Sequence, residues 1–363
     1  MIASPKNNME SPAVHLRIGD GSVSRDGPDC YVIAEIGHNH QGDVEKAKDM
    51  FRIAKECGVN AVKLQKRDNR SLYTRAMYDM PYDNENSFGA TYGQHREALE
   101  FGDDEFSELK RYAHEIGLTL FATAFDFRSA DFLAEHDMPA YKIASGDLKN
   151  TPLLQHVARL GRPMVVSTGG ATMEDVQRAY DAIMPINRQV CLLQCTASYP
   201  VDPEQMNLRV IATYRERFPD VVVGLSDHQN GIAMAIVAYT LGARVIEKHF
   251  TLNRAWKGTD HAFSLEPVGM RKLVRDLRRT SVALGDGVKR NYPCEEKPLV
   301  KMAKKLVAAR NLSEGCMLKR EDIAIKSPND GLPPFELDRV IGKVMRRSLR
   351  EDENISFEDL KDG

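Results

Sequence analysis

Two histidines, 21 residues apart, each close a short run of apolar residues. One helix-length segment separates His228 from His249. This layout predicts strand, helix and strand, so both imidazoles are expected at the same end of neighbouring parallel strands. Neutral imidazoles that converge at one point of a sheet edge are typical ligands of a divalent metal. Either histidine alone could be a hydrogen-bonded surface residue, but each has a carboxylate beside it (Asp227, Glu247), and the pair favours a metal site.

Polar side chains also end the other apolar runs of this chain. They are Glu35, Lys63, Gln65, Thr123, Lys142, Ser145, Ser167, Thr168, Thr196, Tyr199, Ser226 and Glu247. Lysines with Ser and Thr hydroxyls suit a phosphate, because the ammonium supplies charge and the hydroxyls supply donors. Imidazoles with carboxylates suit a metal that polarises a carbonyl group. We therefore expect a phosphorylated anion beside an electrophile. Asp260, in a turn beyond the last run, could bind sugar hydroxyls or simply form the turn.

The elements that would position these residues form eight strand–helix units. The predicted strands are residues 31–36, 60–65, 118–123, 140–144, 163–168, 190–195, 221–226 and 244–249. The predicted helices include 44–57, 103–116, 129–135, 173–184, 203–218, 231–241 and 267–284. Eight such units in about 250 residues predict an α/β fold of the (β/α)8 TIM-barrel class. An open doubly wound sheet is the alternative, but its phosphate signature G-x-G-x-x-G is absent.

Two further segments stand outside this repeat. Residues 66–101 are too long for an ordinary loop, and we expect them either to cover the mouth of the barrel or to be a surface excursion. The barrel domain is predicted over 1–285, a linker over 286–300 and a small second domain over 301–363. Within the last, 310–323 aligns without gaps on 347–360, which indicates a pseudo-symmetric module.

Composition excludes several classes of function. The net charge is -2 with both signs spread along the chain, which does not favour nucleic acid or an anionic membrane as a partner. Residues 1–7 lack the apolar core of a signal peptide, and no apolar stretch reaches the ~20 residues that span a bilayer. The six cysteines form no C-x-x-C pair. We expect free, mostly buried thiols in a reducing cytoplasm.

The motifs at these strand ends resemble those of the sialic acid synthase family, which condenses phosphoenolpyruvate with an amino-sugar aldehyde. The matching segments arrive in the family's order and are residues 34–42, 62–65, 142–145, 167–169, 195–200, 224–228, 247–250 and 258–261. The C-terminal module resembles the family's antifreeze-like (β-clip) domain. In relatives this domain reaches over the partner's barrel, so the resemblance implies a domain-swapped homodimer.

The resemblance also implies roles for single residues. The implied phosphoenolpyruvate contacts are Lys63, Thr123, Lys142, Ser145, Ser167 and Ser226. The implied metal ligands are His228 and His249, with Mn²⁺ as the usual ion and Co²⁺ or Mg²⁺ as alternatives. Glu35 is implied as the carboxylate near both metal and phosphoenolpyruvate. The implied groups around the acceptor sugar are Gln65, Tyr199, Glu247 and Asp260.

Two positions depart from the family pattern. Ala197 stands where some relatives have an Asn among the phosphoenolpyruvate contacts. Ser327 stands where relatives carry an Arg that reaches the acceptor's N-acetyl group. A hydroxyl in place of a guanidinium changes what a pocket can hold. The donor half of the site thus matches the family, while the acceptor half differs from it.

The expected reaction joins C3 of phosphoenolpyruvate to the aldehyde of an open-chain sugar, with the metal polarising the carbonyl and phosphate leaving by C–O cleavage. N-acetylmannosamine is the default acceptor; a di-N-acetylated dideoxyhexose (the precursor of legionaminic or pseudaminic acid) and mannose are alternatives. A metal-dependent sugar isomerase or lyase on the same barrel is a rival enzyme class. A non-enzymatic scaffold is a third possibility, but it would leave the polar strand ends without a use.

Overall fold

The computed structural model describes residues 14–363, and the chain divides into two compact units, with the boundary after Gly285. The expectation for residues 1–7 lies outside the described range. Across residues 14–363, none of the helices is both long enough and apolar enough to cross a membrane. All six cysteines are free.

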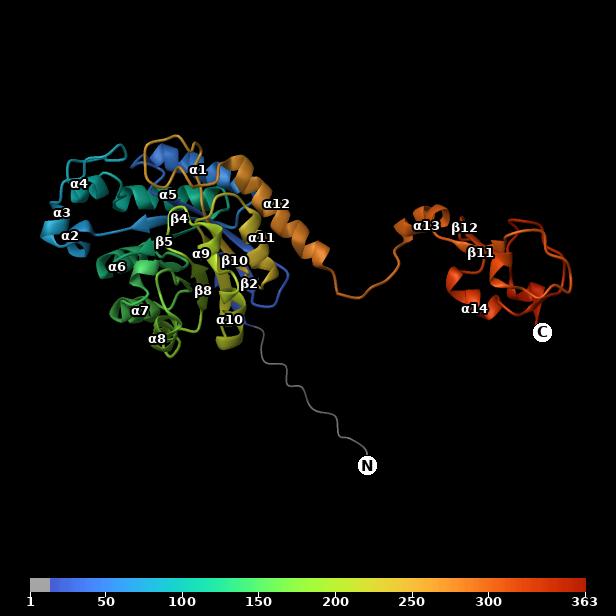
Figure 1. Ribbon diagram of the computed structural model, residues 1–363. Helices are drawn as coiled ribbons and strands as arrows, with labels where there is room; N and C mark the ends of the chain where they lie inside the picture. Colours follow the sequence, from blue (N-terminus) through green and yellow to red (C-terminus); the bar gives the residue numbers. More distant parts are fainter. Residues whose placement is uncertain (1–13) are drawn as a thin grey trace, which may run out of the picture. The chain divides into compact units, whose positions relative to one another are not determined.

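The first unit is a closed barrel of eight parallel strands, in the order β10-β3-β4-β5-β6-β7-β8-β9 (Figure 1). The strands are β3 (Tyr31–Gly37), β4 (Ala61–Lys66), β5 (Thr119–Ala124), β6 (Tyr141–Ile143), β7 (Met164–Ser167), β8 (Val190–Cys195), β9 (Val222–Asp227) and β10 (Val245–His249). Each lies within a residue or two of its predicted range, and the TIM-barrel prediction is confirmed. β10 pairs with β3, which closes the sheet.

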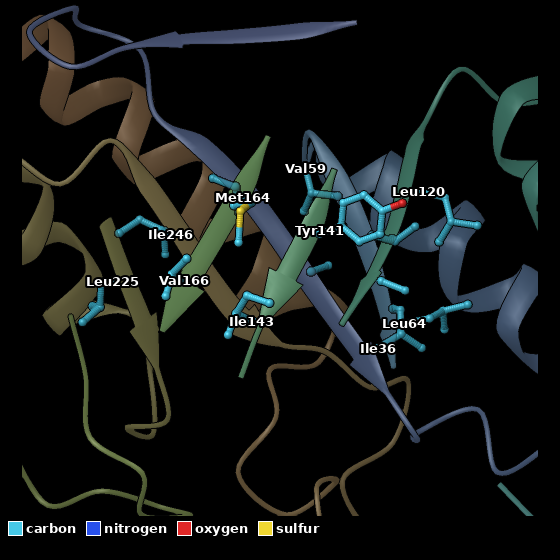
Figure 2. Packing of buried hydrophobic residues seen from close by; sticks show 14 of the residues in the cluster. Ile36, Val59, Leu64, Leu120, Tyr141, Ile143, Met164, Val166, Leu225 and Ile246 are labelled. Carbon is cyan, nitrogen blue, oxygen red and sulfur yellow. The ribbon is translucent and has the colours of Figure 1, made fainter. Parts of the chain in front are cut away.

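Successive side chains of each strand alternate between the inside of the barrel and the surrounding helices. On β3, Tyr31 and Ile33 belong to the apolar cluster inside the barrel, whereas Val32 and Ala34 belong to the larger cluster shared with the helices. Figure 2 shows this outer cluster, with side chains such as Ile143 and Val166. The inner apolar cluster ends before the last inward positions of the strands, so these positions can carry polar groups.

The helices of the barrel pack on its outer face (Figure 1). They are α1 (Val44–Cys57), α5 (Asp103–Glu115), α6 (Phe127–Glu135), α7 (Thr151–Arg159), α8 (Met173–Ile183), α9 (Pro203–Met206), α10 (Val210–Arg217), α11 (Ala233–Thr240) and α12 (Pro267–Leu284). One prediction was wrong: the single helix over 203–218 is divided into α9 and α10. Asn207 adopts a left-handed conformation with φ 42°, which a continuing helix cannot accommodate.

Two elements of the barrel were not predicted. The first is α7, which begins at the N-cap Asn150 with Pro152 in its first turn. The second is the antiparallel hairpin of β1 (His15–Ile18) and β2 (Gly21–Ser24). Its side chains Leu16, Ile18 and Val23 join the apolar cluster inside the barrel. The hairpin therefore closes the barrel end opposite the polar strand ends.

The long segment after β4 forms three short helices, α2 (Asn69–Leu72), α3 (Arg75–Tyr78) and α4 (Tyr92–Glu97). Each has an N-cap side chain that accepts a hydrogen bond from the helix backbone, namely Asp68, Thr74 and Thr91. The segment thus contains three short capped helices, which are joined by non-helical stretches, the longest over residues 79–91.

The second unit contains β11 (Lys305–Ala308), β12 (Ile323–Lys326), β13 (Val344–Met345), β14 (Leu360–Lys361), α13 (Glu296–Met302) and α14 (Leu337–Val340). α13 occupies part of the range expected to be a linker. The internal repeat is visible in one contact, because Arg310 pairs with Asp322 and Arg347 pairs with Asp359 at the equivalent positions. The unit has an apolar cluster of its own, which includes Leu306, Leu318 and Ile355.

Candidate active site

One cavity of about 610 Å³ opens at the carboxyl ends of the barrel strands. The predicted site residues that line it are Glu35, Lys63, Gln65, Thr123, Lys142, Ser145, Ser167, Tyr199, Ser226, His228, Glu247, His249 and Asp260. Thr168 and Thr196, also expected at strand ends, do not line it, because their hydroxyls donate to the backbone carbonyls of Leu193 and Gln205. The lining residues meet there because each barrel strand places its last inward positions at the same edge. Strand register brings neighbours together directly, with Glu35 opposite Lys63 and also opposite His249.

Two buried lysines form the cationic part of the cavity. Lys63 Nζ lies 2.5 Å from Glu35 Oε2 and donates a hydrogen bond of 2.8 Å to Thr123 Oγ1. Lys142 Nζ donates a hydrogen bond of 2.6 Å to Ser167 Oγ. Glu247 Oε1 lies 3.9 Å from both ammonium groups. Two ammonium groups that share hydroxyls and carboxylates can exchange some of these partners for the oxygens of a phosphate.

The carboxylates of this cluster differ in protonation. Burial raises the pKa of Glu35 to about 7, against the opposing effect of Lys63, and the nearby charge of Glu247 adds to the increase. Burial also opposes ionisation of Glu247, but the lysines Lys142 and Lys63 lower its pKa on balance. Two neighbouring carboxylates with separated pKa values allow one to stay ionised while the other exchanges a proton near neutral pH. Burial lowers the pKa of Lys142.

Hydroxyl and backbone groups surround the lysines. Ser145 Oγ accepts a hydrogen bond of 3.0 Å from the backbone N–H of Gly169. Ser226 Oγ donates to Glu247 Oε1 over 3.4 Å. A Cβ on Gly169 would lie 2.7 Å from Ser145 Oγ, so only glycine lets this backbone approach so closely. The hydroxyls are therefore held in place at the lysine side of the cavity.

The two histidines face each other across the other side of the cavity. Their ring centroids are 5.4 Å apart, and Tyr199 packs 4.2 Å from the ring of His228. His228 Nδ1 lies 3.0 Å from the carbonyl oxygen of Thr196. Because a carbonyl only accepts, Nδ1 must carry a hydrogen, so Nε2 is the nitrogen whose lone pair can bind a metal. Burial lowers the pKa of His249, which favours the neutral form of that ring.

The donor set at this point fits a divalent metal with two protein ligands. His249 Nδ1 and Glu247 Oε2 are buried without a hydrogen-bond partner among the described residues. Asp260 Oδ2 lies 3.6 Å from His249 Nδ1. Within residues 14–363 no group of three or more His, Cys, Asp or Glu side chains is arranged to hold a metal. An ion bound by His228 and His249 would thus complete its coordination with water or substrate.

Gln65 and Asp260 lie between the two halves of the cavity. Gln65 Nε2 donates a hydrogen bond of 2.8 Å to Glu35 Oε1. Gly37, at φ 53°, permits this arrangement, because a Cβ there would lie 3.3 Å from Gln65 Nε2 and 3.4 Å from both Asp260 Oδ2 and Glu35 Oε1. A side chain at position 37 would therefore press on three site residues at once.

Several lining residues were not assigned from the sequence. They are Arg67, Asn86, Arg96, Phe125, Ala144, Gly146 and Thr259. Three of them, Arg67, Asn86 and Arg96, come from the long segment after β4. The expectation that this segment covers the barrel mouth pointed to the right region, but strand-end spacing cannot identify residues that arrive from a separate subdomain.

The two departures from the expected pattern lie in different units. Ala197 lines the cavity, beside Gly169, where it offers no polar group. Ser327 belongs to the second unit, where its Oγ accepts a hydrogen bond of 2.7 Å from Lys304 Nζ.

Comparisons with known proteins agree with this architecture. The chain matches the model of the NeuB family over residues 50–289 and that of the SAF domain over residues 305–361. It is 42% identical to the N-acetylneuraminate-9-phosphate synthase of Homo sapiens, over 92% of this chain and 93% of that one. It is 32% identical to the N,N'-diacetyllegionaminic acid synthase of Legionella pneumophila, over 92% and 95%. A crystal structure of N-acetylneuraminic acid synthetase from Leptospira borgpetersenii in complex with citrate matches with a TM-score of 0.68 and 29% identity, covering 79% of this chain and 95% of that one.

Proposed function

The chain belongs to the NeuB family, and from this premise we propose that it condenses phosphoenolpyruvate with an open-chain amino sugar to give a nonulosonic acid. It is an enzyme of the transferase class that forms a carbon–carbon bond, as its relatives are. The observation that carries the specific proposal is that one cavity holds two lysines with hydroxyl groups on one side and the pair His228 and His249 on the other.

In this proposal, C3 of phosphoenolpyruvate bonds to the aldehyde carbon of the sugar, whose oxygen takes up a proton. Water adds to C2, and the C–O bond to the phosphate then breaks, so inorganic phosphate leaves and a keto group forms. Lys63 and Lys142 would offset the phosphate charge throughout, and the hydroxyls of Ser145 and Ser167 would orient it. Glu35, whose pKa is raised to about 7 by burial, would take a proton from the attacking water.

His228 and His249 would hold the divalent metal, for which we propose Mn²⁺, with Co²⁺ or Mg²⁺ as substitutes. When bound, such an ion supplies a Lewis acid that polarises a carbonyl. Tyr199 and Phe263 pack against the imidazoles and help to orient them. Gln65 and Asp260 would bind hydroxyl groups of the acceptor.

The acceptor is expected to be a hexose with an amino substituent, of the N-acetylmannosamine type. The relatives' names differ on this point, since they include N-acetylneuraminate-9-phosphate, N,N'-diacetyllegionaminic acid and pseudaminic acid synthases. Three carbons come from phosphoenolpyruvate, so C9 of a nine-carbon product is C6 of the acceptor.

The test is phosphate release from phosphoenolpyruvate across a panel of aldoses with Mn²⁺ present. The panel contains N-acetylmannosamine and its 6-phosphate, mannose and a di-N-acetylated dideoxyhexose. Release that requires both phosphoenolpyruvate and one aldose supports the proposal; turnover of an aldose without phosphoenolpyruvate would instead indicate an isomerase or lyase. Phosphoenolpyruvate labelled in its bridging oxygen should deliver the label to phosphate, and label in the sugar acid would contradict C–O cleavage.

We also propose a cytoplasmic homodimer in which the second unit contributes to the partner's barrel. The second unit exposes large apolar side chains, among them Phe335 at 80% and Met302 at 63%. Exposed apolar groups on so small a unit favour a covering surface. Light scattering coupled to gel filtration should give twice the monomer mass, and a monomer with full activity would contradict the proposal.

A further inference from the structure

Asn39 is a buried polar residue that has no place in the chemistry described above. It lies in the turn over residues 38–42, directly after β3, and is 1% exposed. It does not line the cavity. A buried amide needs hydrogen-bond partners, because it has given up its hydration and an unpaired amide would not recover that free energy. The partners of Asn39 therefore show what its side chain does.

Both partners belong to the loop over residues 250–266, which joins β10 to α12. Asn39 Nδ2 donates a hydrogen bond of 2.9 Å to the carbonyl oxygen of Phe250 and one of 3.0 Å to Ser264 Oγ. The carbonyl oxygen can only accept, which fixes the orientation of the amide, and both N–H groups of Nδ2 are used. One side chain thus binds the beginning and the end of this loop, 211 and 225 positions away in sequence.

Ser264 extends this attachment to Asp260. Ser264 is 2% exposed, and its Oγ donates a hydrogen bond of 2.5 Å to the carbonyl oxygen of Asp260. The hydroxyl accepts from Asn39 and donates its single hydrogen to Asp260, so the two hydrogen bonds are compatible with each other. A chain of two buried hydrogen bonds therefore connects the turn after β3 with the backbone of a residue that lines the cavity.

The same amide also fixes the backbone beside His249. Phe250 follows His249, and its N–H donates a hydrogen bond of 2.8 Å to the carbonyl oxygen of Glu35, while its own carbonyl accepts from Asn39. Both polar backbone groups of Phe250 are therefore bound by β3 and the turn that follows it. Asp260 Oδ2 lies 3.6 Å from His249 Nδ1, so both residues of this contact are attached to the barrel through Asn39.

The other contacts of the loop hold Asp260 less firmly. Thr251 Oγ1 lies 2.7 Å from His261 Nδ1, but both residues belong to the loop, so this contact shapes the loop without attaching it to the barrel. Gln41 Nε2 donates to the carbonyl oxygen of Lys257, but that contact is exposed and water competes for it. Residues 253–255 are exposed as well. The position of Asp260 therefore depends on the buried connection through Ser264 and Asn39.

We propose that Asn39 is a positioning residue, which holds Asp260 beside His249 through Ser264 and through the carbonyl oxygen of Phe250. This inference rests on the proposed function, in which Asp260 binds the acceptor sugar and His249 binds the metal. Asn39 touches neither substrate nor metal and acts through two residues that do. Its loss should therefore weaken acceptor and metal binding, while phosphoenolpyruvate, which is assigned to the lysine side of the cavity, should bind as before.

The experiment measures kcat and both KM values in Asn39→Ala and Ser264→Ala, with the aldose of the panel above that supports phosphate release. Each variant should raise the KM for the aldose by about 10-fold or more, because a displaced binding group costs at least this much, and should leave the KM for phosphoenolpyruvate within about 2-fold. The double variant should lose no more than the more affected single variant, since both residues act through one chain of hydrogen bonds.

Asn187→Ala is the matched control. Asn187 is 6% exposed, and its Nδ2 donates a hydrogen bond of 2.7 Å to the carbonyl oxygen of Arg162, so it is also a buried amide bound to backbone. It lies before β8, at the amino end of that strand, and does not line the cavity. Asn187→Ala should lower the thermal stability of the protein without changing either KM value.

Calorimetric titration of each apoprotein with Mn²⁺ gives a second readout, which needs no turnover. Asn39→Ala should weaken Mn²⁺ binding by about 10-fold, the lower end of the effect of groups that support a metal ligand, and Asn187→Ala should leave it unchanged.

Equal increases of both KM values, or a lower kcat with both KM values unchanged, would show that Asn39 serves only the fold and would overturn the inference while the proposed function stands. If Asn39→Ala does not fold, the KM values of Ser264→Ala decide the question in the same way. If no aldose supports phosphate release from phosphoenolpyruvate, the proposed function itself fails. The Mn²⁺ titration then still tests Asn39, and an unchanged affinity in folded Asn39→Ala would overturn its role.

Discussion

Glu35 and Glu247 show how side chains with the same chemistry acquire different roles from their surroundings. Both are buried at the top of the barrel, yet burial raises the pKa of Glu35 to about 7, while Lys142 and Lys63 overcome burial and lower that of Glu247. Glu35 is thus the carboxylate that changes protonation near neutral pH.

A pH profile tests this assignment. If Glu35 acts as a base, kcat/KM for phosphoenolpyruvate should rise as the pH increases through about 7, because the protonated form present below that value cannot accept a proton. Glu35→Gln should lower kcat by about 100-fold or more and remove this ionisation from the profile. If Glu35→Gln shows the same decrease of kcat/KM at low pH as the wild-type enzyme, the ionisation belongs to another group.

The histidine pair makes a separate prediction that does not depend on turnover. His249→Ala should weaken Mn²⁺ binding by at least about 100-fold. Loss of a group that only hydrogen-bonds to a metal ligand already weakens metal affinity by about 10–100-fold, and loss of the ligand itself should weaken it at least as much. His156→Ala is the control, because His156 lies on α7 and pairs with Asp131 outside the cavity. Calorimetric titration of each apoprotein measures the effect, and equal affinities in the two variants would remove the metal role.

At the scale of elements, β9 and β10 are joined behind the site by a buried ion pair. Lys248 Nζ lies 2.8 Å from Asp227 Oδ2, and both residues are 1% exposed. Lys248 and Asp227 lie opposite each other in the register of the two strands. His249 follows Lys248 in the chain and His228 follows Asp227, and both histidines line the cavity. The pair therefore helps to set the distance between the two imidazoles from the opposite face of the sheet.

Breaking this pair should affect both stability and metal affinity. Lys248→Met leaves the carboxylate of Asp227 buried without its partner and should cost about 3–5 kcal/mol of unfolding free energy. Lys248→Arg should restore most of the stability and Mn²⁺ affinity, because it restores the ion pair. Urea denaturation and metal titration measure the two effects. A stable Lys248→Met with unchanged Mn²⁺ affinity would show that the pair does not position the histidines.

At the scale of the whole molecule, the chain combines a barrel with a second unit that has its own apolar cluster and an internal repeat. The repeat extends to side-chain contacts, because buried Asp322 and Asp359 each accept from an arginine twelve positions earlier. In each copy, this carboxylate stabilises the turn that precedes β12 or β14.

Equivalent substitutions in the two copies should therefore have similar effects. Asp322→Ala and Asp359→Ala should each reduce the stability of the second unit by about 1–3 kcal/mol, since each removes a buried carboxylate that accepts hydrogen bonds from an arginine and from a second donor, the Lys319 N–H or the Ser356 hydroxyl. The single tryptophan, Trp256, lies in the barrel, so its fluorescence follows that unit, while calorimetry follows both. We expect the calorimetric transition to shift more than the fluorescence transition; equal shifts would show that the two units unfold together.

Much of the fold and the candidate site could be predicted from local sequence. Period-two alternation with a polar residue at the end of each apolar run identifies the inward positions, because strand geometry sends every second side chain to one face. That rule was sufficient to place Lys63, Lys142, His228 and His249 in one cavity. It was less reliable where a single residue overrides helix propensity, as Asn207 does between α9 and α10.

The barrel and the residues at its strand ends could be predicted from the chain's local pattern, since both follow from short-range periodicity and the closure of a parallel sheet. The arrangement of groups that meet from distant segments became visible only in the folded molecule. Arg96 reaches the cavity on α4, and its contact with His38 joins residues 58 positions apart in sequence. No local pattern encodes such a contact, because its free energy arises from burial and charge that exist only after the chain has folded.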